Sequence, residues 1–182
     1  MIFIKILIMM SRISNFFTES GQVILNPDDF LYYKCQSKGY NGILTLIFYH
    51  VILALIIGIT TKDLVTTLLL VAIAIIFPLV YRFIKSIFVY AFAKLLGGTG
   101  SFMNTFNLTS YSSVLNILII LGFALTFFDK LVIIPILLLV YLWKMVIEII
   151  AVSEEHNIGY GKSFLANYGI FYLIVIILVG LL

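Results

Sequence analysis

The chain alternates long apolar stretches with short polar turns. A helix rises ~1.5 Å per residue and the hydrocarbon core of a bilayer is ~30 Å thick, so about 20 apolar residues can cross it. We therefore predict an all-α integral membrane protein, a bundle of five transmembrane helices. The expected spans are residues 43–59, 64–82 with an extension to 96, 114–128, 131–152 and 164–182.

The second apolar stretch, residues 64–96, is too long for a simple span. As one helix it would reach about 50 Å, beyond a hydrocarbon core of ~30 Å. Pro78 should kink this helix, and Arg82 and Lys85 mark where we expect it to leave the bilayer. We predict one long, bent helix whose residues 83–96 form an amphipathic extension.

Residues 1–42 hold the one sizeable polar stretch and are predicted to form a cytoplasmic and interfacial segment before a membrane domain at 43–182. Residues 1–10 are apolar but too short to span, and no small-residue cleavage site follows, which argues against a signal peptide. Translation could start at Met9 or Met10 instead of Met1, or the first residues could form an interfacial tether.

Two short helices are expected in this segment. Ile13, Phe16 and Phe17 can form one side of a short surface helix. Asn26 followed by Pro27 predicts a second helix to about Ser37, because Asn caps helices well and Pro suits the first helical position. This second helix is either interfacial, lying on the headgroups, or a simple cytosolic lead-in.

The glycine-rich turn at residues 97–101 should end the long helix. Gly97, Gly98 and Gly100 lie where a helix C-terminus favours glycine, and Ser101 or Thr99 can cap the next helix at Phe102. Such a turn could also hold phosphate, but the chain has no Walker pattern, so a helix–helix turn is favoured. Residues 102–113 are predicted to be helical and interfacial, with hydroxyls that bond between helices or line a wet cavity.

Residues 143–162 carry most of the candidate chemistry. Lys144 and Glu148 are four positions apart and share a helix face; they form a structural or snorkelled pair, or they line a polar groove. His50, near the middle of the first span, is either a functional group or a neutral histidine bonded to a neighbouring helix. The other candidate positions are Trp143, His156, Gly159 and Lys162, the last three in a loop predicted at 153–163.

Composition supports a membrane protein and offers little for catalysis. Apolar residues make up 63% of the chain and charged residues 10%, against roughly 25% charged in soluble domains. The net charge of +3 is spread over loops and gives no case for nucleic acid. The single cysteine, Cys35, excludes an internal disulfide. Without an HExxH or a Ser-His-Asp order, we predict no catalytic residue, metal or cofactor.

The basic residues predict an orientation. Nine fall on one side of a five-span topology and two, Lys62 and Lys130, on the other. Because cytoplasmic loops are enriched in Lys and Arg, we expect a cytoplasmic N-terminus and an external C-terminus. The nine are Lys5, Arg12, Lys34, Lys38, Arg82, Lys85, Lys94, Lys144 and Lys162.

Several features occur together in a characteristic order. They are the Pro-acid-Phe lead-in at 25–30, the glycine turn at 94–102, Tyr111-Ser112-Ser113, and Trp143 in the fourth span followed by Glu148, His156, Gly159 and Lys162. In this order and with this five-span layout, residues 25–182 resemble the Yip family, the Ypt/Rab-interacting multi-pass membrane proteins, in its prokaryotic branch.

The resemblance implies a fold and a compartment. Eukaryotic relatives lie in ER and Golgi membranes, associate with Rab GTPases and take part in vesicle traffic. This chain lacks their long acidic-polar N-terminal region and Asp-Leu-Tyr-Gly-Pro motif, so we do not expect Rab-type GTPase binding. We expect a multi-pass protein of a prokaryotic cell membrane.

Three functions are compatible with these patterns. The favoured one is a non-enzymatic scaffold that contacts membrane lipids, other membrane proteins or itself. The alternative is a small transporter or lipid-translocating protein with a polar groove around Glu148. A membrane enzyme is least favoured, because Glu154, Glu155 and His156 are adjacent in an expected loop and zinc needs converging ligands.

Overall fold

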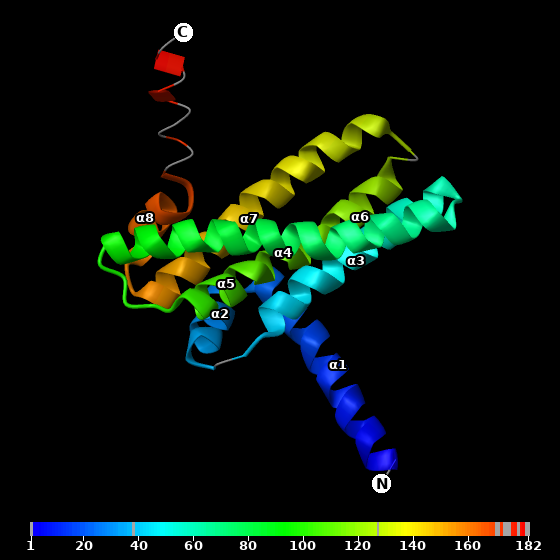
Figure 1. The fold of residues 1–182 in the computed structure, drawn as a ribbon, viewed down its shortest axis with the longest axis horizontal. Helices are drawn as coiled ribbons and strands as arrows, with labels where there is room; N and C mark the ends of the chain where they lie inside the picture. The colour runs from blue at the N-terminus through cyan, green and yellow to red at the C-terminus, as the bar shows by residue number, and fades with distance from the viewer. Residues whose placement is uncertain are drawn as a thin grey trace.

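A computed structural model describes residues 2–37, 39–126, 128–169, 172, 176–177 and 179–180, with side chains from Ile13 onward. These residues form helices joined by short turns (Figure 1). In chain order the helices are α1 (Ile2–Leu25), α2 (Pro27–Gln36), α3 (Asn41–Thr61), α4 (Leu64–Leu95), α5 (Phe102–Ser110), α6 (Asn116–Leu125), α7 (Ile133–His156) and α8 (Gly159–Phe164). Short 3-10 segments, Tyr111–Leu115 and Lys130–Val132, precede α6 and α7, and a π-helical turn, Leu165–Gly169, follows α8.

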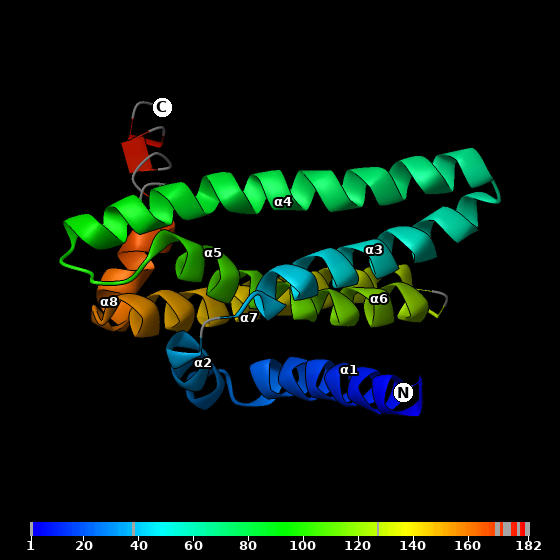
Figure 2. The same cartoon turned by 60° about the horizontal axis from the view of Figure 1, so that its bottom comes forward.

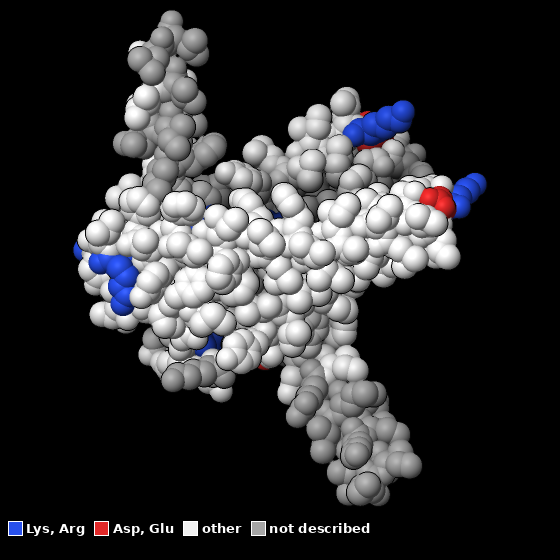
Figure 3. Space-filling view, in the orientation of Figure 1, with Lys and Arg blue, Asp and Glu red and all other residues white. Residues whose placement is uncertain are grey.

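Four helical stretches of the described chain are long and apolar enough to cross a membrane: Asn41–Thr61, Leu64–Leu95, Phe102–Leu125 and Lys130–His156. They run along the long axis of the molecule (Figure 2). In the view of Figure 3 the charged side chains gather mainly at the two ends of this axis, with a broad uncharged surface between them. The first four predicted spans are thus confirmed as helices. Most of the fifth, 164–182, lies outside the described residues.

Helix α4 is the single long helix that the sequence predicts. It runs unbroken through Pro78, and Figure 2 shows it as one continuous helix along the length of the molecule. Residues 83–96 continue this helix, and the structure shows which side of it packs against the bundle. Arg82 and Ser86 are buried in the protein, while Ile84 and Phe88 are exposed. Arg82 finds polar partners inside the bundle, and the exposed apolar side chains can face lipid.

The N-terminal segment is packed more tightly than predicted. One 24-residue helix, α1, replaces the short surface helix, and Phe16 contacts Phe48 of α3 at 5.2 Å between ring centroids. Helix α2 begins at Pro27 as predicted. Its Phe30 and Leu31 are buried in the main core, with Phe30 5.1 Å from the ring of Tyr111. Core packing therefore holds apolar side chains for which the sequence left two alternatives, a helix lying on the headgroups and a cytosolic lead-in.

Residues 105–116 form the polar centre of the bundle instead of an interfacial surface. The hydroxyls of Thr105, Thr109 and Ser110 donate to carbonyls one turn earlier, at 2.7–2.8 Å. These local bonds offset the cost of burying them. Small side chains also let helices approach closely: a Cβ on Gly42 of α3 would lie 1.9 Å from the carbonyl oxygen of Asn107.

The loop predicted at 153–163 is mostly helical. Helix α7 continues to His156, Asn157 then adopts a left-handed conformation with φ 54°, and α8 follows at once. Val152, Ser153 and His156 are buried, so packing extends the helix through a polar sequence that by itself favours a loop.

Candidate functional site

Glu148 is the centre of a buried ion cluster built from four segments. It lies on α7, and its carboxylate faces Arg82 and Lys85 of α4. Arg82 Nη1 donates to Oε1 and Lys85 Nζ donates to Oε2, each at 2.5 Å. Ser112 Oγ, from the 3-10 segment before α6, donates to Oε1 at 3.0 Å. Tyr168 Oη, from the turn after α8, donates to Oε2 at 2.7 Å.

The carboxylate of Glu148 is saturated by these contacts. Two donors meet each oxygen, which is the full capacity of about four lone-pair sites. Arg82 Nη2 also donates to Ser112 Oγ at 2.8 Å, and Lys85 Nζ lies 4.7 Å from the centre of the Tyr168 ring. Glu148 is only 4% exposed, so a charge there requires this dense pairing.

The predicted Lys144–Glu148 pair is replaced by other partners. Lys144 Nζ donates to Asn116 Oδ1 at 2.6 Å, and the carboxylate is occupied by the cations of α4. The snorkelling alternative is also wrong for Glu148, because its side chain is buried. Sharing a helix face made the pair possible, but the two cations of α4 reach the carboxylate from across the helix interface.

A cavity of about 550 Å³, here called the Glu148 cavity, lies beside the cluster. His50 lines it, and His50 Nδ1 pairs with the carbonyl oxygen of Leu46 at 2.7 Å, in its own helix and not a neighbouring one. Arg82 Nε and Ser113 Oγ are buried, and no described residue pairs with them. The full lining comprises Leu46, His50, Phe77, Pro78, Tyr81, Arg82, Lys85, Ser113, Tyr141, Lys144, Met145, Glu148, Asn167 and Tyr168.

The glycine turn wraps around the end of α7. Thr99 N donates to the carbonyl of His156 at 3.1 Å, and the buried His156 pairs through Nε2 with Thr105 Oγ1 at 2.8 Å. A Cβ on Gly98 would lie 2.7 Å from His156 Nδ1, and one on Gly100 would lie 2.6 Å from the carbonyl oxygen of Glu155. Gly97 has φ 93°. This turn is therefore a packing device, as the helix–helix interpretation predicts.

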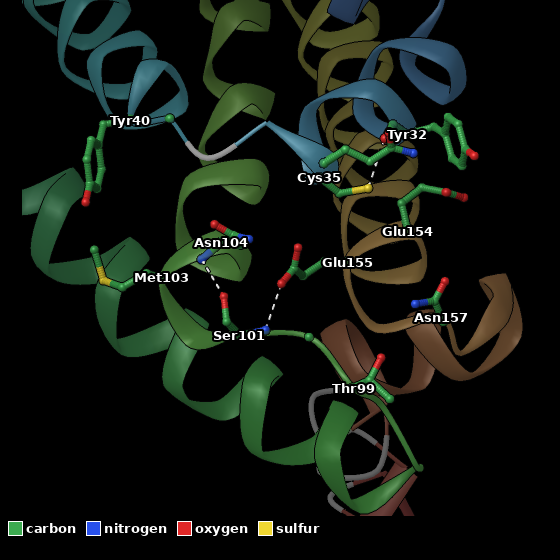
Figure 4. Close-up of a pocket in the computed structure, with 13 residues that line it drawn as sticks. Tyr32, Cys35, Tyr40, Thr99, Ser101, Met103, Asn104, Glu154, Glu155 and Asn157 are labelled. Atoms are coloured by element: carbon green, nitrogen blue, oxygen red, sulfur yellow. Dashed lines mark hydrogen bonds between the residues drawn. The ribbon is translucent and has the colours of Figure 1, made fainter.

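A second cavity, of about 760 Å³, opens at the same end of the bundle and is here called the end cavity (Figure 4). Glu155 points into it and accepts from Ser101 N at 2.7 Å. Ser101 caps α5 by accepting from Asn104 N, as predicted. Burial and the nearby Glu155 and Glu154 raise the pKa of the Cys35 thiol at its wall. The lining comes from three separate parts of the chain, which is why the sequence pattern did not reveal it: Tyr32, Cys35, Gln36, Gly39, Tyr40, Thr99, Gly100, Ser101, Met103, Asn104, Glu154, Glu155 and Asn157.

The remaining predicted positions tie helices together. Trp143 Nε1 donates to the carbonyl of Ile24 near the end of α1, at 3.2 Å. Lys162 Nζ donates to the carbonyl of Leu96 after α4, also at 3.2 Å, where a cation complements the helix C-terminus. Gly159 begins α8 with φ 74°. None of the three lines either cavity.

Most members of the ion cluster are not evident from the sequence pattern. Arg82 and Lys85 are predicted at the membrane boundary, and Tyr168 lies within the apolar fifth span, where no pattern distinguishes it. The sequence feature that could have indicated the cluster is the spacing of Arg82 and Lys85. They lie about one helical turn apart, so both can reach the same carboxylate. Among the described residues, no group of three or more His, Cys, Asp or Glu could hold a metal ion.

The described residues are helical, and four of their helical stretches are long and apolar enough to cross a membrane. This fold, with an ion cluster buried between the helices, defines the class as a multi-pass membrane protein. The model of the Yip1 domain matches residues 21–182, and the chain belongs to this family. The resemblance to the Yip family is thereby confirmed. No curated protein and no solved structure matches the chain.

Proposed function

We propose that this Yip-family protein is a non-enzymatic scaffold, contributing to membrane organisation or trafficking-type processes through lipid and partner-protein contacts. The observation that carries this proposal is the end cavity, an open, partly polar hollow of about 760 Å³. It adjoins a rigid framework in which His156, Glu155 and the glycine turn are locked by hydrogen bonds.

The chemistry of the end cavity favours a basic protein segment as its occupant. Glu154 and Glu155 line it, and no Lys or Arg is among its described lining residues. Tyr32 and Tyr40 add exposed aromatic surface, the kind of side chain that is enriched at interfaces. An acidic hollow repels anionic lipid headgroups, so a membrane protein or a second copy of the chain suits it better.

We further propose that the end cavity faces the cytoplasm and that the protein lies in the cell membrane of a prokaryote. The nine-to-two distribution of basic residues supports this orientation. Cys35, the single cysteine, lines the end cavity, so one thiol reports on its side of the membrane. A membrane-impermeant maleimide should label Cys35 only after intact cells are opened. Labelling in intact cells would reverse the orientation.

The scaffold proposal is tested by photo-crosslinking in the native membrane. A photoreactive residue replaces Gln36, which lines the end cavity, or Thr60, which lies at the opposite end as a matched control. We expect a discrete adduct from position 36 that is absent from position 60 and weakened by Glu154→Lys. Glu154 is suitable because it lines the cavity outside the ion cluster. Identical adducts at both positions, or none at 36, would contradict the proposal.

Transport or lipid translocation is the second candidate, favoured by the Glu148 cavity of about 550 Å³. The saturation of Glu148 weighs against a mobile ion or proton at that carboxylate. A flux assay in proteoliposomes that compares wild type with Glu148→Gln decides between the scaffold and the transport proposals. Rates at or below the protein-free background for both would eliminate transport.

A further inference from the structure

The Glu148 cavity carries more positive charge than its carboxylate can balance. Arg82, Lys85 and Lys144 line it, and Glu148 is the sole carboxylate among its described lining residues. Apart from His50, one anion faces three cations. Cations that are wholly or partly buried are costly without a counter-ion, so the excess charge favours an anion as the ligand of this cavity.

The cavity also holds hydrogen-bond donors without acceptors. Arg82 is 7% exposed and Ser113 is 1% exposed, yet Arg82 Nε and Ser113 Oγ have no partner among the described residues. Within the same residues Lys144 Nζ makes one hydrogen bond, to Asn116, out of the three that an ammonium can donate. Buried polar groups are nearly always paired in native proteins, and these three donors line one cavity. A phosphate oxygen would accept from each.

The depth and lining of the cavity select a lipid as the source of that phosphate. Arg82 lies about 27 Å along α4 from Leu64, which starts the helix at the opposite end. It is therefore near the far edge of a hydrocarbon core of ~30 Å, where headgroups begin. Phe77 and Tyr81 are 67% and 56% exposed at the wall of the cavity, and they lie on the lipid-facing helix α4. An acyl chain can thus remain in the bilayer while its headgroup enters.

The geometry points to the Glu148 cavity as a binding site for the phosphate of an anionic phospholipid, held by Arg82, Lys144 and Ser113. This inference deepens the lipid-contact part of the proposed function and rests on it. Asn167 lines the same cavity, and its buried Oδ1 is an acceptor that no donor in the described part of the chain reaches. A headgroup hydroxyl can donate to it, which makes phosphatidylglycerol the suitable probe.

The test measures lipid binding to the purified full chain in an uncharged detergent, by native mass spectrometry and by the shift in melting temperature. The additions are phosphatidylglycerol, phosphatidylcholine and inorganic phosphate at matched ionic strength. We expect phosphatidylglycerol to bind at least about tenfold more tightly than phosphatidylcholine, because its net negative charge complements the site. Equal binding of the two lipids would overturn the inference. Equal protection by inorganic phosphate would overturn the lipid assignment.

Three variants locate the site. Lys144→Gln should reduce the preference for phosphatidylglycerol by about tenfold, since a charged donor is lost. Lys94→Gln is the control: it removes the same charge from α4, outside the cavity, and should leave the preference for phosphatidylglycerol unchanged. Ser113→Ala removes a hydroxyl without a partner, so the fold should be retained while binding weakens about threefold. Wild-type binding in both Lys144→Gln and Ser113→Ala would overturn the site, whatever the crosslinking at position 36 shows.

Discussion

The two ends of the bundle are closed in different ways. At one end, which we call the turn end, each connection is held by neighbours in sequence: Asp63 accepts from Val65 N and Thr66 N, and Asp129 accepts from Leu131 N at 2.9 Å. The other end, the long-range end, is held by residues far apart in sequence. Ser101 N meets Glu155, and Thr99 N meets the carbonyl of His156.

This difference separates local folding from cooperative folding. A turn whose capping bonds span two or three residues can form and open alone, because it orders few residues at once. The long-range end requires α4, α5, α7 and α8 to be in place together. A substitution at the turn end should therefore have a small, local effect, and one at the long-range end should weaken the whole bundle.

The largest effect is expected at Glu148, whose cluster lies toward the long-range end of α4. Glu148→Ala leaves the buried Arg82 and the half-buried Lys85 without their counter-ion, which should lower the free energy of unfolding by about 3–5 kcal/mol. Unfolding in mixed micelles of increasing SDS fraction measures this loss. Glu154→Gln, outside the cluster, is the control and should change stability by under about 0.5 kcal/mol. Equal losses would show that the cluster is not structural.

Gly98→Ala should have the next largest effect. The added Cβ would meet His156 Nδ1 at 2.7 Å and the carbonyl oxygen of Ala93 at 2.8 Å. Such overpacking costs about 1–3 kcal/mol. Gly161→Ala is the matched control, because nothing lies within 4 Å of a Cβ there and Ala favours the helix by up to about 1 kcal/mol. The same unfolding titration should thus give shifts of opposite sign.

A smaller effect is expected at the turn end. Asp129→Ala removes the side-chain bond to Leu131 N and should cost about 1 kcal/mol or less. Asp129→Asn keeps an acceptor and should be close to wild type. Hydrogen exchange should show faster exchange at residues 130–132 alone. If protection also fell at the glycine turn, the contrast between the two ends would not hold.

The smallest effect concerns the reactivity of Cys35 at the long-range end. Burial, with Glu155 and Glu154 nearby, raises the pKa of this thiol, so its thiolate forms at higher pH than that of a free cysteine. Maleimide labelling should therefore rise at higher pH than for glutathione. Glu154→Gln lowers this pKa and should speed labelling at fixed pH by less than about tenfold. An unchanged labelling rate in Glu154→Gln would show that Glu154 does not affect the pKa of the Cys35 thiol.

Predictions from sequence succeeded where one segment decides its own structure. Apolar length predicted the first four spans, Pro27 predicted the start of α2, and Ser101 predicted the cap of α5. They failed at residues 153–163 and at the Lys144–Glu148 pair. In both cases a distant element supplied the stabilising contacts: the glycine turn for His156, and α4 for Glu148.

The sequence by itself determined that the chain is helical, apolar and suited to a membrane, because helix length, capping and hydropathy are properties of short segments. The tertiary structure alone decided which polar residues meet. Glu148 could have paired with Lys144 on its own helix, but buried charges require several donors at once, and those come from α4, the segment before α6 and the turn after α8. The two cavities arise in the same way, from side chains that only packing brings together.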